Sequence, residues 1–549
     1  KNLGLVYGPI TEGSAMQELE VLSVFILSFT LLGGVAFYCY RKGHRIPSRY
    51  LDPVLNRLPD KLADLLLSLR GDEPGPGGII AGIGEPRYKS VSLFSGAMGL
   101  DIGLESSGRF ETIAAVEIHP SFAETIRTNV NLGNTSFSGC RVFEKDIHGY
   151  APEKLMEELG LKPGELDLLT GGPPCQSYST AGKRGTIQDR RGLLIWRFLH
   201  FVEVMRPKYF FMENVRGLMS AALRHRPIAE RPNKGGPPFE PDEEPGSVLR
   251  QFIADLPEEY RMDCFEVNAV NYGAPQIRER VLFVGNRLGQ VNEFQDPTHF
   301  GVNFLEEILG FNRDFPNEVG AASFDNPQPH NTLKDALHGL VDDNQEVLDF
   351  SPRKKEYLSL VPEGGNWRCL EPDQAKEIMK RAYYAKGGRS GWLRRLSWDL
   401  PAPTILAMPN HASTSLCHPS EVRALSLAEC ARIQEFPDEW VFCGSTQEKY
   451  EQVGNAVPIR LGRIAGDVIS YSLDQSLGEA VVRDHSSEQG LSDAFTRTYI
   501  MAHIRTRKYF ENGKAVIRDN EDTASSNYSS PVTINSEPRT AIRTIPQES

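Results

Sequence analysis

In Lys89-Ser-Val-Ser-Leu-Phe-Ser-Gly-Ala-Met-Gly-Leu-Asp101, an apolar run enters a glycine-containing turn. Residues 89–94 have the composition of a short β-strand, and the residues after the turn open a helix. Gly96 and Gly99 let the backbone approach a ligand that a side chain would exclude, although a tight turn without a ligand also suits them. The motif therefore predicts a strand, a turn and a helix, and other residues must decide whether a ligand binds.

Further strand-like apolar runs follow this motif. Helical stretches separate them, and they lie at residues 113–116, 166–170, 209–212 and 281–284. This alternation predicts an α/β domain in which repeated strand and helix units build a mostly parallel sheet. A segment rich in Pro, Gly and charge at residues 224–246 indicates a surface loop.

Length and composition limit the possible classes of protein. A chain of 549 residues predicts two or three domains, and 40% hydrophobic with 24% charged residues is ordinary for globular proteins. The formal charge of −12 excludes a surface coated in positive charge, so contact with nucleic acid would need a local basic patch. The eight cysteines form no C-x-x-C pair and none has zinc-ligand spacing with a histidine, so we expect neither a disulfide scaffold nor a bound metal.

A hydrophobic segment lies near the start of the sequence. Residues 21–40 carry no charge, and a helix of that length spans about 30 Å, the thickness of the hydrocarbon core of a membrane. Basic residues follow it from Arg41 to Arg49, which would place the rest of the chain in the cytoplasm. A buried helix, or an upstream segment absent from the mature protein, is the alternative to a membrane anchor.

Two carboxylates stand where α/β folds hold nucleotides. Glu117 ends the second strand-like run about twenty residues after the glycine turn, where an acid accepts hydrogen bonds from ribose hydroxyls. Asp146 stands at the next strand end and could bind an adenine amino group. The simpler alternative for each carboxylate is a helix cap or a solvated charge.

A cysteine ends the most informative stretch, Asp167-Leu-Leu-Thr-Gly-Gly-Pro-Pro-Cys175, where an apolar strand runs into a Gly-Pro turn. The turn presents the thiol, and nucleophilic attack would require local stabilisation of its thiolate, whereas a purely structural loop would not. Glu213 and Asn214 directly follow another apolar strand. Because ligands bind outside the carboxyl ends of the strands in such sheets, Cys175 and Glu213 can converge on one substrate.

Two arginines precede the last strand-like run. Arg278 and Arg280 are two residues apart, which places them on one face of an extended segment. Paired guanidinium groups suit a phosphate or a carbonyl oxygen. Surface ion pairing, for example with Glu279, is the alternative.

Together these motifs resemble those of the DNA (cytosine-5) methyltransferases. Residues 94–99 resemble the cofactor loop of that family, Gly172-Pro-Pro-Cys-Gln176 its nucleophile loop, and Glu213-Asn-Val215 its acid motif. Gln276-Ile-Arg-Glu-Arg280 resembles the arginine motif, and Gly454-Asn-Ala-Val-Pro458 the final motif. The resemblance extends over about residues 89–473. It implies an α/β, Rossmann-like, S-adenosylmethionine-dependent methyltransferase domain with a smaller target-recognition lobe.

The resemblance also implies a mechanism. Cys175 would add to C6 of a cytosine that has rotated out of the DNA duplex, and C5 would then take the methyl group of S-adenosyl-L-methionine. Glu213 would hold or protonate N3, and Asn214 would support the pocket. Arg278 and Arg280 would brace the base oxygen and the DNA backbone. Loss of the C5 proton and of the thiol would release 5-methylcytosine and S-adenosyl-L-homocysteine.

Several cofactor contacts carry over from the family: Phe94, Gly96, Gly99, Glu117, Asp146, Ile147, Pro174 and Asn455. Two positions depart from the family's pattern. Ser92 stands where members often have Asp, and Ile277 stands where a basic residue is common. Either change could weaken a cofactor or phosphate contact, but neither removes a proposed catalytic group.

The long segment before the final motif corresponds to the part of the family that reads the target sequence. It contains Arg353-Lys-Lys355, Asn366-Trp-Arg368 and the basic stretch at residues 386–395. Basic groups among Trp, Tyr and Gly suit anchoring to a phosphate backbone, and a solvated surface is the alternative. The recognised DNA sequence does not follow from this composition.

The expected layout places an N-terminal segment at residues 1–50, a linker at 51–87, the methyltransferase domain at 88–290 and 396–475, the target-recognition region at 291–395, and a partly disordered polar tail at 476–549. This layout resembles prokaryotic restriction-modification enzymes, so double-stranded DNA and a cognate restriction endonuclease are the expected partners of a cytoplasmic, DNA-associated monomer. A transfer-RNA (cytosine-5) methyltransferase and a catalytically silent DNA-binding homologue are the alternatives.

Overall fold

The computed structural model describes most of the chain between residues 88 and 476. The described ranges are 88–134, 139–174, 194–290, 328–385 and 389–476, together with residues 292, 294, 295 and 297–300. Two short strand pairs are also described. They are β1 (Ile46–Pro47) with β2 (Arg70–Gly71), and β14 (Phe510–Glu511) with β15 (Lys514–Ala515). Two compact units divide the chain, Lys1–Gly75 and Pro76–Ser549. The apolar segment at residues 21–40 and Cys175 lie outside the described residues. No helix of the described ranges is long and apolar enough to cross a membrane.

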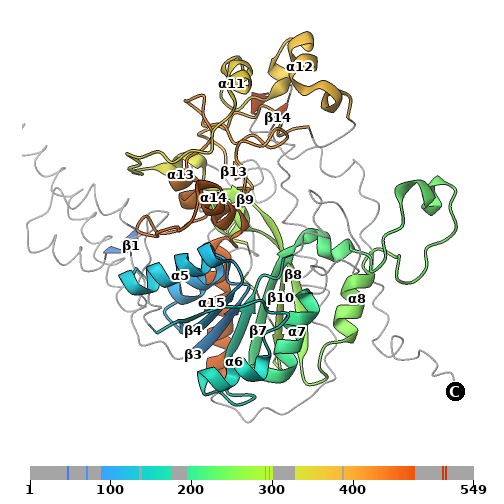
Figure 1. The fold of residues 1–549 in the computed structure, drawn as a ribbon, viewed down its shortest axis with the longest axis vertical. Helices are drawn as coiled ribbons and strands as arrows, with labels where there is room; N and C mark the ends of the chain where they lie inside the picture. Colours follow the sequence, from blue (N-terminus) through green and yellow to red (C-terminus); the bar gives the residue numbers. More distant parts are fainter. Residues whose placement is uncertain are drawn as a thin grey trace, which may run out of the picture. The chain divides into compact units, whose positions relative to one another are not determined.

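A seven-stranded sheet forms the centre of the second unit, in the order β5-β4-β3-β6-β7-β10-β8 (Figure 1). Its strands are β3 (Tyr88–Leu93), β4 (Phe110–Glu117), β5 (Arg141–Glu144), β6 (Leu168–Gly171), β7 (Tyr209–Val215), β8 (Arg261–Asn268) and β10 (Glu279–Asn286). Neighbouring strands pair in parallel except at β10, which is antiparallel to both β7 and β8. The predicted α/β fold with a mostly parallel sheet is therefore confirmed, and each predicted strand overlaps an observed one.

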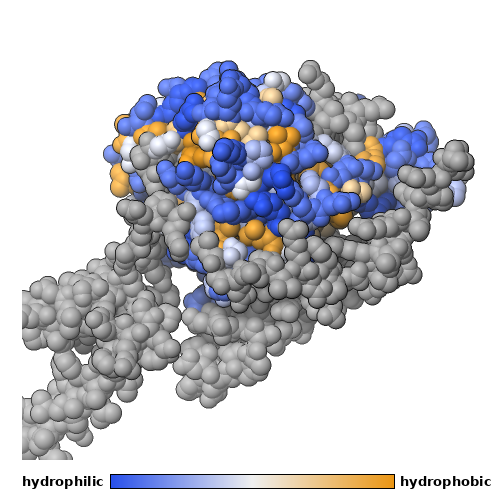
Figure 2. All heavy atoms as spheres, turned by 90° about the horizontal axis from the view of Figure 1, so that it is seen from below, coloured by the Kyte–Doolittle hydropathy of each residue, from blue (hydrophilic) through white to orange (hydrophobic). Residues whose placement is uncertain are grey.

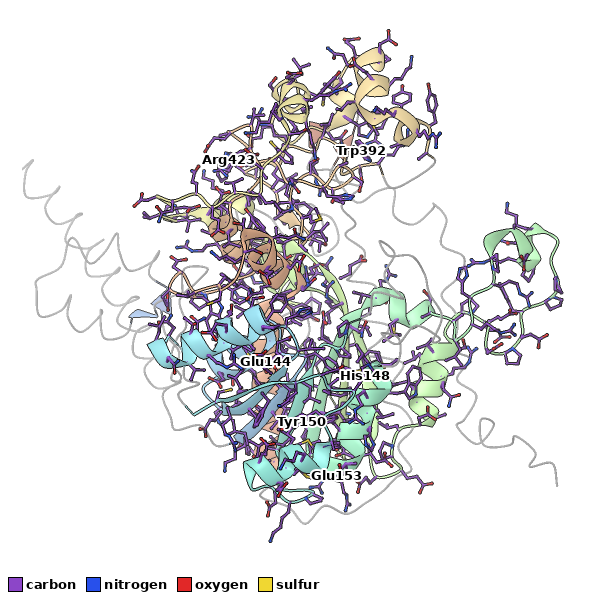
Figure 3. All side chains as sticks on the ribbon, viewed as in Figure 1. Glu144, His148, Tyr150, Glu153, Trp392 and Arg423 are labelled. Carbon is purple, nitrogen blue, oxygen red and sulfur yellow. The ribbon has the colours of Figure 1, made fainter. Side chains whose placement is uncertain are left out.

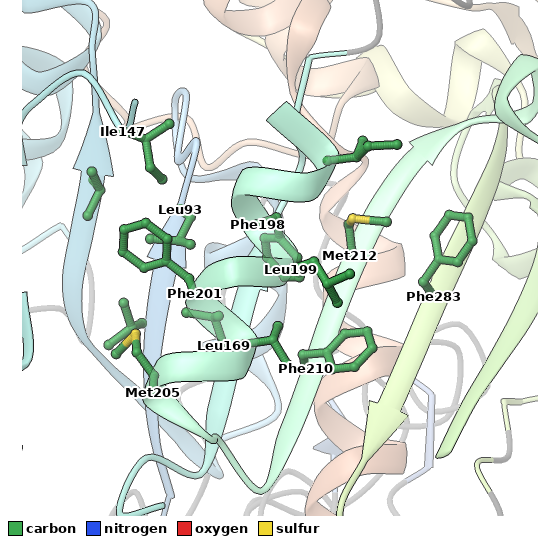
Figure 4. Close-up of a cluster of buried hydrophobic side chains, with 14 of the residues drawn as sticks. Leu93, Ile147, Leu169, Phe198, Leu199, Phe201, Met205, Phe210, Met212 and Phe283 are labelled. Carbon is green, nitrogen blue, oxygen red and sulfur yellow. The ribbon is translucent and has the colours of Figure 1, made fainter. Parts of the chain in front are cut away.

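Helices cover both faces of this sheet. One face packs against α6 (Pro152–Leu159), α7 (Leu194–Met205) and α8 (Ser247–Ala254), and the other against α4 (Gly99–Ser106) and α15 (Ile459–Ser476). Because both faces are covered, the strands are apolar at successive positions and do not alternate with polar residues. In β7, for example, Phe210 and Met212 belong to the core under α7, as Figure 4 shows, whereas Tyr209 and Phe211 belong to the core on the opposite face.

Glycines bring the last described helix close to the first. A Cβ atom at Gly103 in α4 would lie 2.0 Å from the main-chain oxygen of Ile459, and one at Gly462 in α15 would lie 2.1 Å from that of Leu100. These distances require residues without side chains. Helix α15, which follows the final motif, thus completes one face of a sheet that begins about 370 residues earlier in the chain.

Shorter elements lie between β10 and α15. They are the paired strands β9 (Gln276–Ile277) with β13 (Ala402–Pro403) and β11 (His299–Phe300) with β12 (Gln328–Pro329), and the helices α10 (Leu333–Leu337), α11 (Pro352–Ser359), α12 (Pro372–Met379), α13 (Leu427–Ile433) and α14 (Thr446–Asn455). Helix α5 (Pro120–Leu132) follows β4. A separate small core joins α11 and α12 to the segments around Leu393, Cys417 and Ala424, and we call this part the small lobe. Figure 1 shows α11 and α12 at the far end from α6.

The surface of the described residues is that of an ordinary globular protein. Figure 2 shows one face that is mainly hydrophilic, with apolar side chains between the polar ones.

The loop predicted at residues 224–246 lies at the surface and contains two short 3₁₀ turns, η2 (Ile228–Glu230) and η3 (Pro232–Lys234). Ion pairs such as that of Arg224 with Asp242 hold its two ends together, so the prediction of a surface loop is confirmed.

Candidate active site

The glycine turn after β3 has an unusual backbone. Phe94, Gly96 and Met98 have positive φ angles of 55°, 56° and 66°, and α4 begins at Gly99. A Cβ atom at Gly96 would meet no atom within 4 Å, whereas one at Gly99 would lie 2.6 Å from the main-chain oxygen of Val457. Gly96 therefore borders open space, and Gly99 is required by the packing of the turn against the final motif.

The carboxylate of Glu117 lies beside this turn. It is buried at the end of β4, and its Oε2 accepts a hydrogen bond of 2.8 Å from the N–H of Gly96. Its Oε1 accepts from the N–H groups of Ile118 and His119 at 2.8 and 2.9 Å. Three main-chain donors thus fix a negatively charged group at the edge of the glycine turn, with oxygen lone pairs left for further donors.

The other expected cofactor residues also follow parallel strands. Asp146 is exposed after β5, and its Oδ1 accepts from the N–H of His148 at 2.9 Å; the neighbouring Glu144 and His148 are labelled in Figure 3. Ile147 is buried in the core that Figure 4 shows, and Pro174 is exposed after β6. Because β3, β4, β5 and β6 are parallel, the residues after them share one edge of the sheet.

The final motif reaches the same edge. Asn455 is exposed at the end of α14, and the next residues, Ala456 and Val457, pack against Gly99. A Cβ atom at Gly454 would lie 2.3 Å from the main-chain nitrogen of Ala407. The structure thus brings the first and last motifs together, although more than 350 residues separate them in the sequence.

Glu213 forms an ion pair with Arg280 across neighbouring strands. Nε of Arg280 contacts Oε1 of Glu213, and 11% of each side chain is exposed. On the other side of the carboxylate, Oε2 would lie 3.5 Å from a Cβ atom at Gly172. Glu213 therefore lies between Arg280 and Gly172, which is three residues before Cys175 in the sequence. Burial strengthens the attraction between the carboxylate and the guanidinium group.

Asn214 holds the same loop from the next position of β7. Its Nδ2 donates a hydrogen bond of 3.2 Å to the main-chain oxygen of Pro173, and its Oδ1 accepts from the N–H of Val215 at 2.9 Å. Pro173 is two residues before Cys175. The acid motif and the start of the nucleophile loop are therefore in contact, as their positions after strands predicted.

Arg278 has a different environment from Arg280. It is buried, and its guanidinium donates to the main-chain oxygens of Ile405, Gly454 and Ala456 at 2.9, 2.9 and 2.8 Å. The structure does not bring its side chain to Glu213, as it does that of Arg280. The spacing of the two arginines gave no indication of this division, because the partners of Arg278 lie 127 to 178 residues further along the chain.

Two glutamines, to which the motif comparison assigned no role, add hydrogen bonds between the arginine motif and the final motif. Nε2 of Gln276 donates to Oε1 of Gln434 at 2.5 Å, and Nε2 of Gln434 donates to the main-chain oxygens of Val453 and Ala456 at 2.6 and 3.2 Å. Both glutamines are fully buried. Gln276 lies in the arginine motif, but only the folded chain shows that Gln434 is its partner.

Ser92, which stands where the family often has Asp, forms a hydrogen bond with a buried carboxylate. Oγ of Ser92 donates to Oδ2 of Asp101 at 2.8 Å, and Oγ1 of Thr170 donates to Oδ1 at 3.0 Å. A carboxylate from α4 therefore lies under the glycine turn, next to the position where the family often has Asp. Burial raises the pKa of Asp101 to about 6.

Comparison with known proteins agrees with this geometry. The C-5 cytosine-specific DNA methylase family matches residues 88–470. The type II methyltransferase M.Sau96I of Staphylococcus aureus is 34% identical over 390 residues, which cover 71% of this chain and 77% of that protein. The type II methyltransferase M.Eco47II of Escherichia coli is 34% identical over 398 residues, which cover 71% of this chain and 80% of that protein.

The fold and the site define an S-adenosylmethionine-dependent methyltransferase of Rossmann-like architecture. The open space at Gly96 and the fixed carboxylate of Glu117 lie at the sheet edge where such folds bind their ligands, and both suit a cofactor that carries hydroxyl groups. The chain belongs to the C-5 cytosine-specific DNA methylase family. Among the described residues, no group of three or more His, Cys, Asp or Glu side chains could hold a metal ion.

Proposed function

We propose that this chain transfers a methyl group from S-adenosyl-L-methionine to C5 of a cytosine in a specific double-stranded DNA sequence. The observation that carries the proposal is the position of Glu213. This acid is paired with Arg280 and lies against Gly172, at the start of the loop that presents Cys175. An acid and a guanidinium at one sheet edge, with a cysteine three residues after Gly172 in the sequence, suit a reaction in which a pyrimidine ring gains and then loses electron density.

The proposed reaction begins with the thiolate of Cys175. Cytosine C5 is a weak nucleophile, so a bond between the Cys175 sulfur and C6 is needed to place electron density on C5. The hydrogen bond from Asn214 to Pro173 fixes the start of the loop that carries this sulfur. Since C6 is covered inside a stacked duplex, the base must rotate out of the helix to reach it.

Glu213 and Arg280 act on the opposite side of the ring. As charge develops at N3, the carboxyl group of Glu213 shares a proton with that nitrogen. Arg280, already on Oε1 of Glu213, has further N–H groups for the base oxygen. After methylation, loss of the C5 proton to a base and return of the C6–S electron pair to sulfur regenerate the thiolate and leave 5-methylcytosine.

We propose that Arg278 positions the final motif and does not contact the cytosine base. Its guanidinium holds main-chain oxygens on both sides of Asn455, as well as that of Ile405. With Gln276 and Gln434 it sets the distance between the final motif and the glycine turn. Asn455, Glu117, Phe94, Gly96, Gly99, Asp146, Ile147 and Pro174 are the proposed contacts of the cofactor, which supplies an electrophilic methyl group on its sulfonium sulfur.

The proposal extends to the setting of the enzyme. Both relatives are type II methyltransferases by name, and we propose for this chain a cognate restriction endonuclease as a partner, with a monomeric enzyme acting on DNA in the cytoplasm. Residues 291–395 are the proposed target-recognition region between the two parts of the methyltransferase domain. A membrane anchor at residues 21–40 stays a prediction.

Bisulfite sequencing of DNA from cells that express the chain tests the function. We expect cytosines within one short sequence to resist conversion, and the Cys175→Ser variant to leave them unprotected. Methyl transfer from labelled cofactor to duplex DNA and to transfer RNA should be measured in parallel. Labelling of transfer RNA with no labelling of duplex would contradict the proposal.

A further inference from the structure

Two arginines in the small lobe lie against one tryptophan. The guanidinium carbon of Arg368 is 4.7 Å from the ring centre of Trp367, and that of Arg389 is 5.1 Å from it. Trp367 is 9% exposed and belongs to the core of the lobe, so its ring is a rigid support. Cation–π contacts of this kind hold guanidinium groups in place. Nη1 of Arg389 also donates to the main-chain oxygen of Tyr383, and the remaining N–H groups of the two arginines are the donors that a ligand could use.

Other basic residues of the lobe form ion pairs with carboxylates, and Arg368 and Arg389 differ from them in this respect. Arg353 pairs with Glu377 at 2.8 Å, and Lys355 pairs with Asp349. In the part of the chain that the structure describes, no carboxylate forms an ion pair with Arg368 or Arg389. Two like charges near one another repel, and together with burial the charge of Arg389 lowers the pKa of Arg368.

Neighbouring groups add hydrogen-bond donors. Nε1 of Trp367 and Nδ2 of Asn366 are buried and have no acceptor among the described residues. Arg394, on the segment that also carries Arg389, is buried, and its Nε donates to the main-chain oxygen of Ser415 at 3.3 Å. Burial lowers the pKa of Arg394 to about 10. The region thus has donors that no described acceptor satisfies, which favours an anion.

Aromatic side chains continue from this pair to the surface. The ring of Tyr383 contacts that of Trp367 edge-on at 5.6 Å, and the ring of Tyr384 contacts that of Tyr383 at 5.2 Å. Tyr384 is 73% exposed, and Arg368 is also exposed. Figure 3 labels Trp392, whose main-chain oxygen accepts from the N–H of Trp367 at 3.1 Å, beside helix α12 of the lobe. A large ligand can therefore reach the arginines from solvent.

We propose that Arg368 and Arg389, supported by Trp367, form a binding site for a backbone phosphate of duplex DNA. This inference rests on the proposed function, since it makes the lobe a DNA-binding part of the same enzyme. A phosphodiester carries two unesterified oxygens and one negative charge, and two guanidinium groups can each donate to them. A bound phosphate also relieves the repulsion between the two arginines, with which no carboxylate of the described ranges forms an ion pair.

The salt dependence of DNA binding tests this site. Affinity of the full chain for a methylatable duplex and for an unrelated duplex of equal length should be measured over a range of salt concentrations. We expect Arg368→Gln and Arg389→Gln each to lower the slope of log K against log salt by about 0.9, because each removes one phosphate contact. The loss should be equal on both duplexes, since phosphates carry no sequence information.

Matched variants separate charge from folding. Arg206→Gln removes an exposed arginine that already has a carboxylate partner, Glu259, so its slope should equal that of the unchanged chain. Arg368→Lys and Arg389→Lys keep the charge and should keep most of the slope. An unchanged slope in both glutamine variants would overturn the site, and so would a loss confined to the methylatable duplex, which would indicate contacts with bases.

The outcome also separates this site from the proposed function. A chain that shows the slope changes but never methylates duplex DNA keeps the phosphate site and loses the proposed reaction. A chain that methylates duplex DNA with unchanged slopes keeps the reaction and loses the site. Absence of any duplex binding would contradict both.

Discussion

Asn214 donates a hydrogen bond to the main-chain oxygen of Pro173, with 3.2 Å between Nδ2 and the oxygen. The bond is buried and links the end of β7, which carries Glu213, to the loop that carries Cys175. The same amide accepts from the N–H of Val215, so its orientation is fixed on the strand side as well. One side chain therefore joins the strand that carries Glu213 to Pro173, two residues before Cys175 in the sequence.

Removal of this bond should slow methyl transfer. In Asn214→Asp a carboxylate would face the oxygen of Pro173, and in Asn214→Ala the oxygen would lose its donor. Loss of a buried hydrogen bond costs about 1–3 kcal/mol, so we expect a 10- to 100-fold lower single-turnover rate. Cofactor affinity, measured by calorimetry, should change less than threefold. A variant with the rate of the unchanged chain would show that Asn214 does not position the loop.

The two arginines of the arginine motif should affect different steps. Lysine at position 278 cannot donate to three separate main-chain oxygens, so Arg278→Lys should loosen the final motif and weaken cofactor binding about tenfold. Arg280→Lys should lower the single-turnover rate and leave cofactor affinity unchanged, because its partner is Glu213. Calorimetry with the cofactor and rapid-quench methyl transfer on DNA would separate the two effects. The same pattern in both variants would contradict the division of roles.

Sequence patterns predicted the parts of the site that depend on local order. Glu117 and Glu213 each stand at the end of an apolar run, and neighbouring parallel strands bring such positions to one edge of a sheet, so this placement was predictable from the sequence. The fold class followed from the same alternation of strands and helices. These features depend on residues that are close together in the chain.

Contacts between distant segments were not predictable in this way. Nothing in the order of residues places Gln434 against Gln276, or Arg278 against Gly454, because these contacts arise from the packing of α13 and α14 on the sheet edge. The contact of Asp101 with Ser92 joins residues that are only nine positions apart, but it depends on how α4 packs against β3. Ser92 differs from the residue that the family often has at this position. The sequence alone does not show that its hydroxyl group donates to a buried carboxylate.

The open space at Gly96 predicts a selective effect of a single methyl group. Gly96 and Gly133 both have positive φ angles, and a Cβ atom at either would meet nothing within 4 Å. Alanine at each position should therefore lower stability by a similar amount, about 1–2 kcal/mol. Only Gly96→Ala should also weaken cofactor binding, by about tenfold or more, because its methyl group would enter the proposed cofactor space. Equal cofactor affinity in the two variants would contradict this placement.

The pKa of Asp101 predicts a pH-dependent stability difference. Its folded pKa of about 6 exceeds the unfolded value of about 3.9, so between these values the folded chain holds a proton that the unfolded chain has lost. Stability from this group therefore falls as pH rises from about 4 to about 6, by roughly 3 kcal/mol in total.

Asp101→Asn removes that titration. We expect the unfolding free energy of the variant, relative to the unchanged chain, to rise over this pH range and to stay constant above about pH 7. Urea unfolding at a series of pH values would measure the difference. A difference that does not vary with pH would show that the carboxylate is not forced toward its neutral form.

The proposed reaction requires a bond between the sulfur atom of Cys175 and the cytosine ring. A duplex that carries 5-fluorocytosine at the methylated position blocks release of that bond, because fluorine cannot leave as a proton does. With the cofactor present, mass spectrometry of the trapped complex should show the DNA attached to Cys175, and the Cys175→Ser variant should form no adduct. Attachment to another side chain, or no adduct from a preparation that methylates ordinary DNA, would contradict the account.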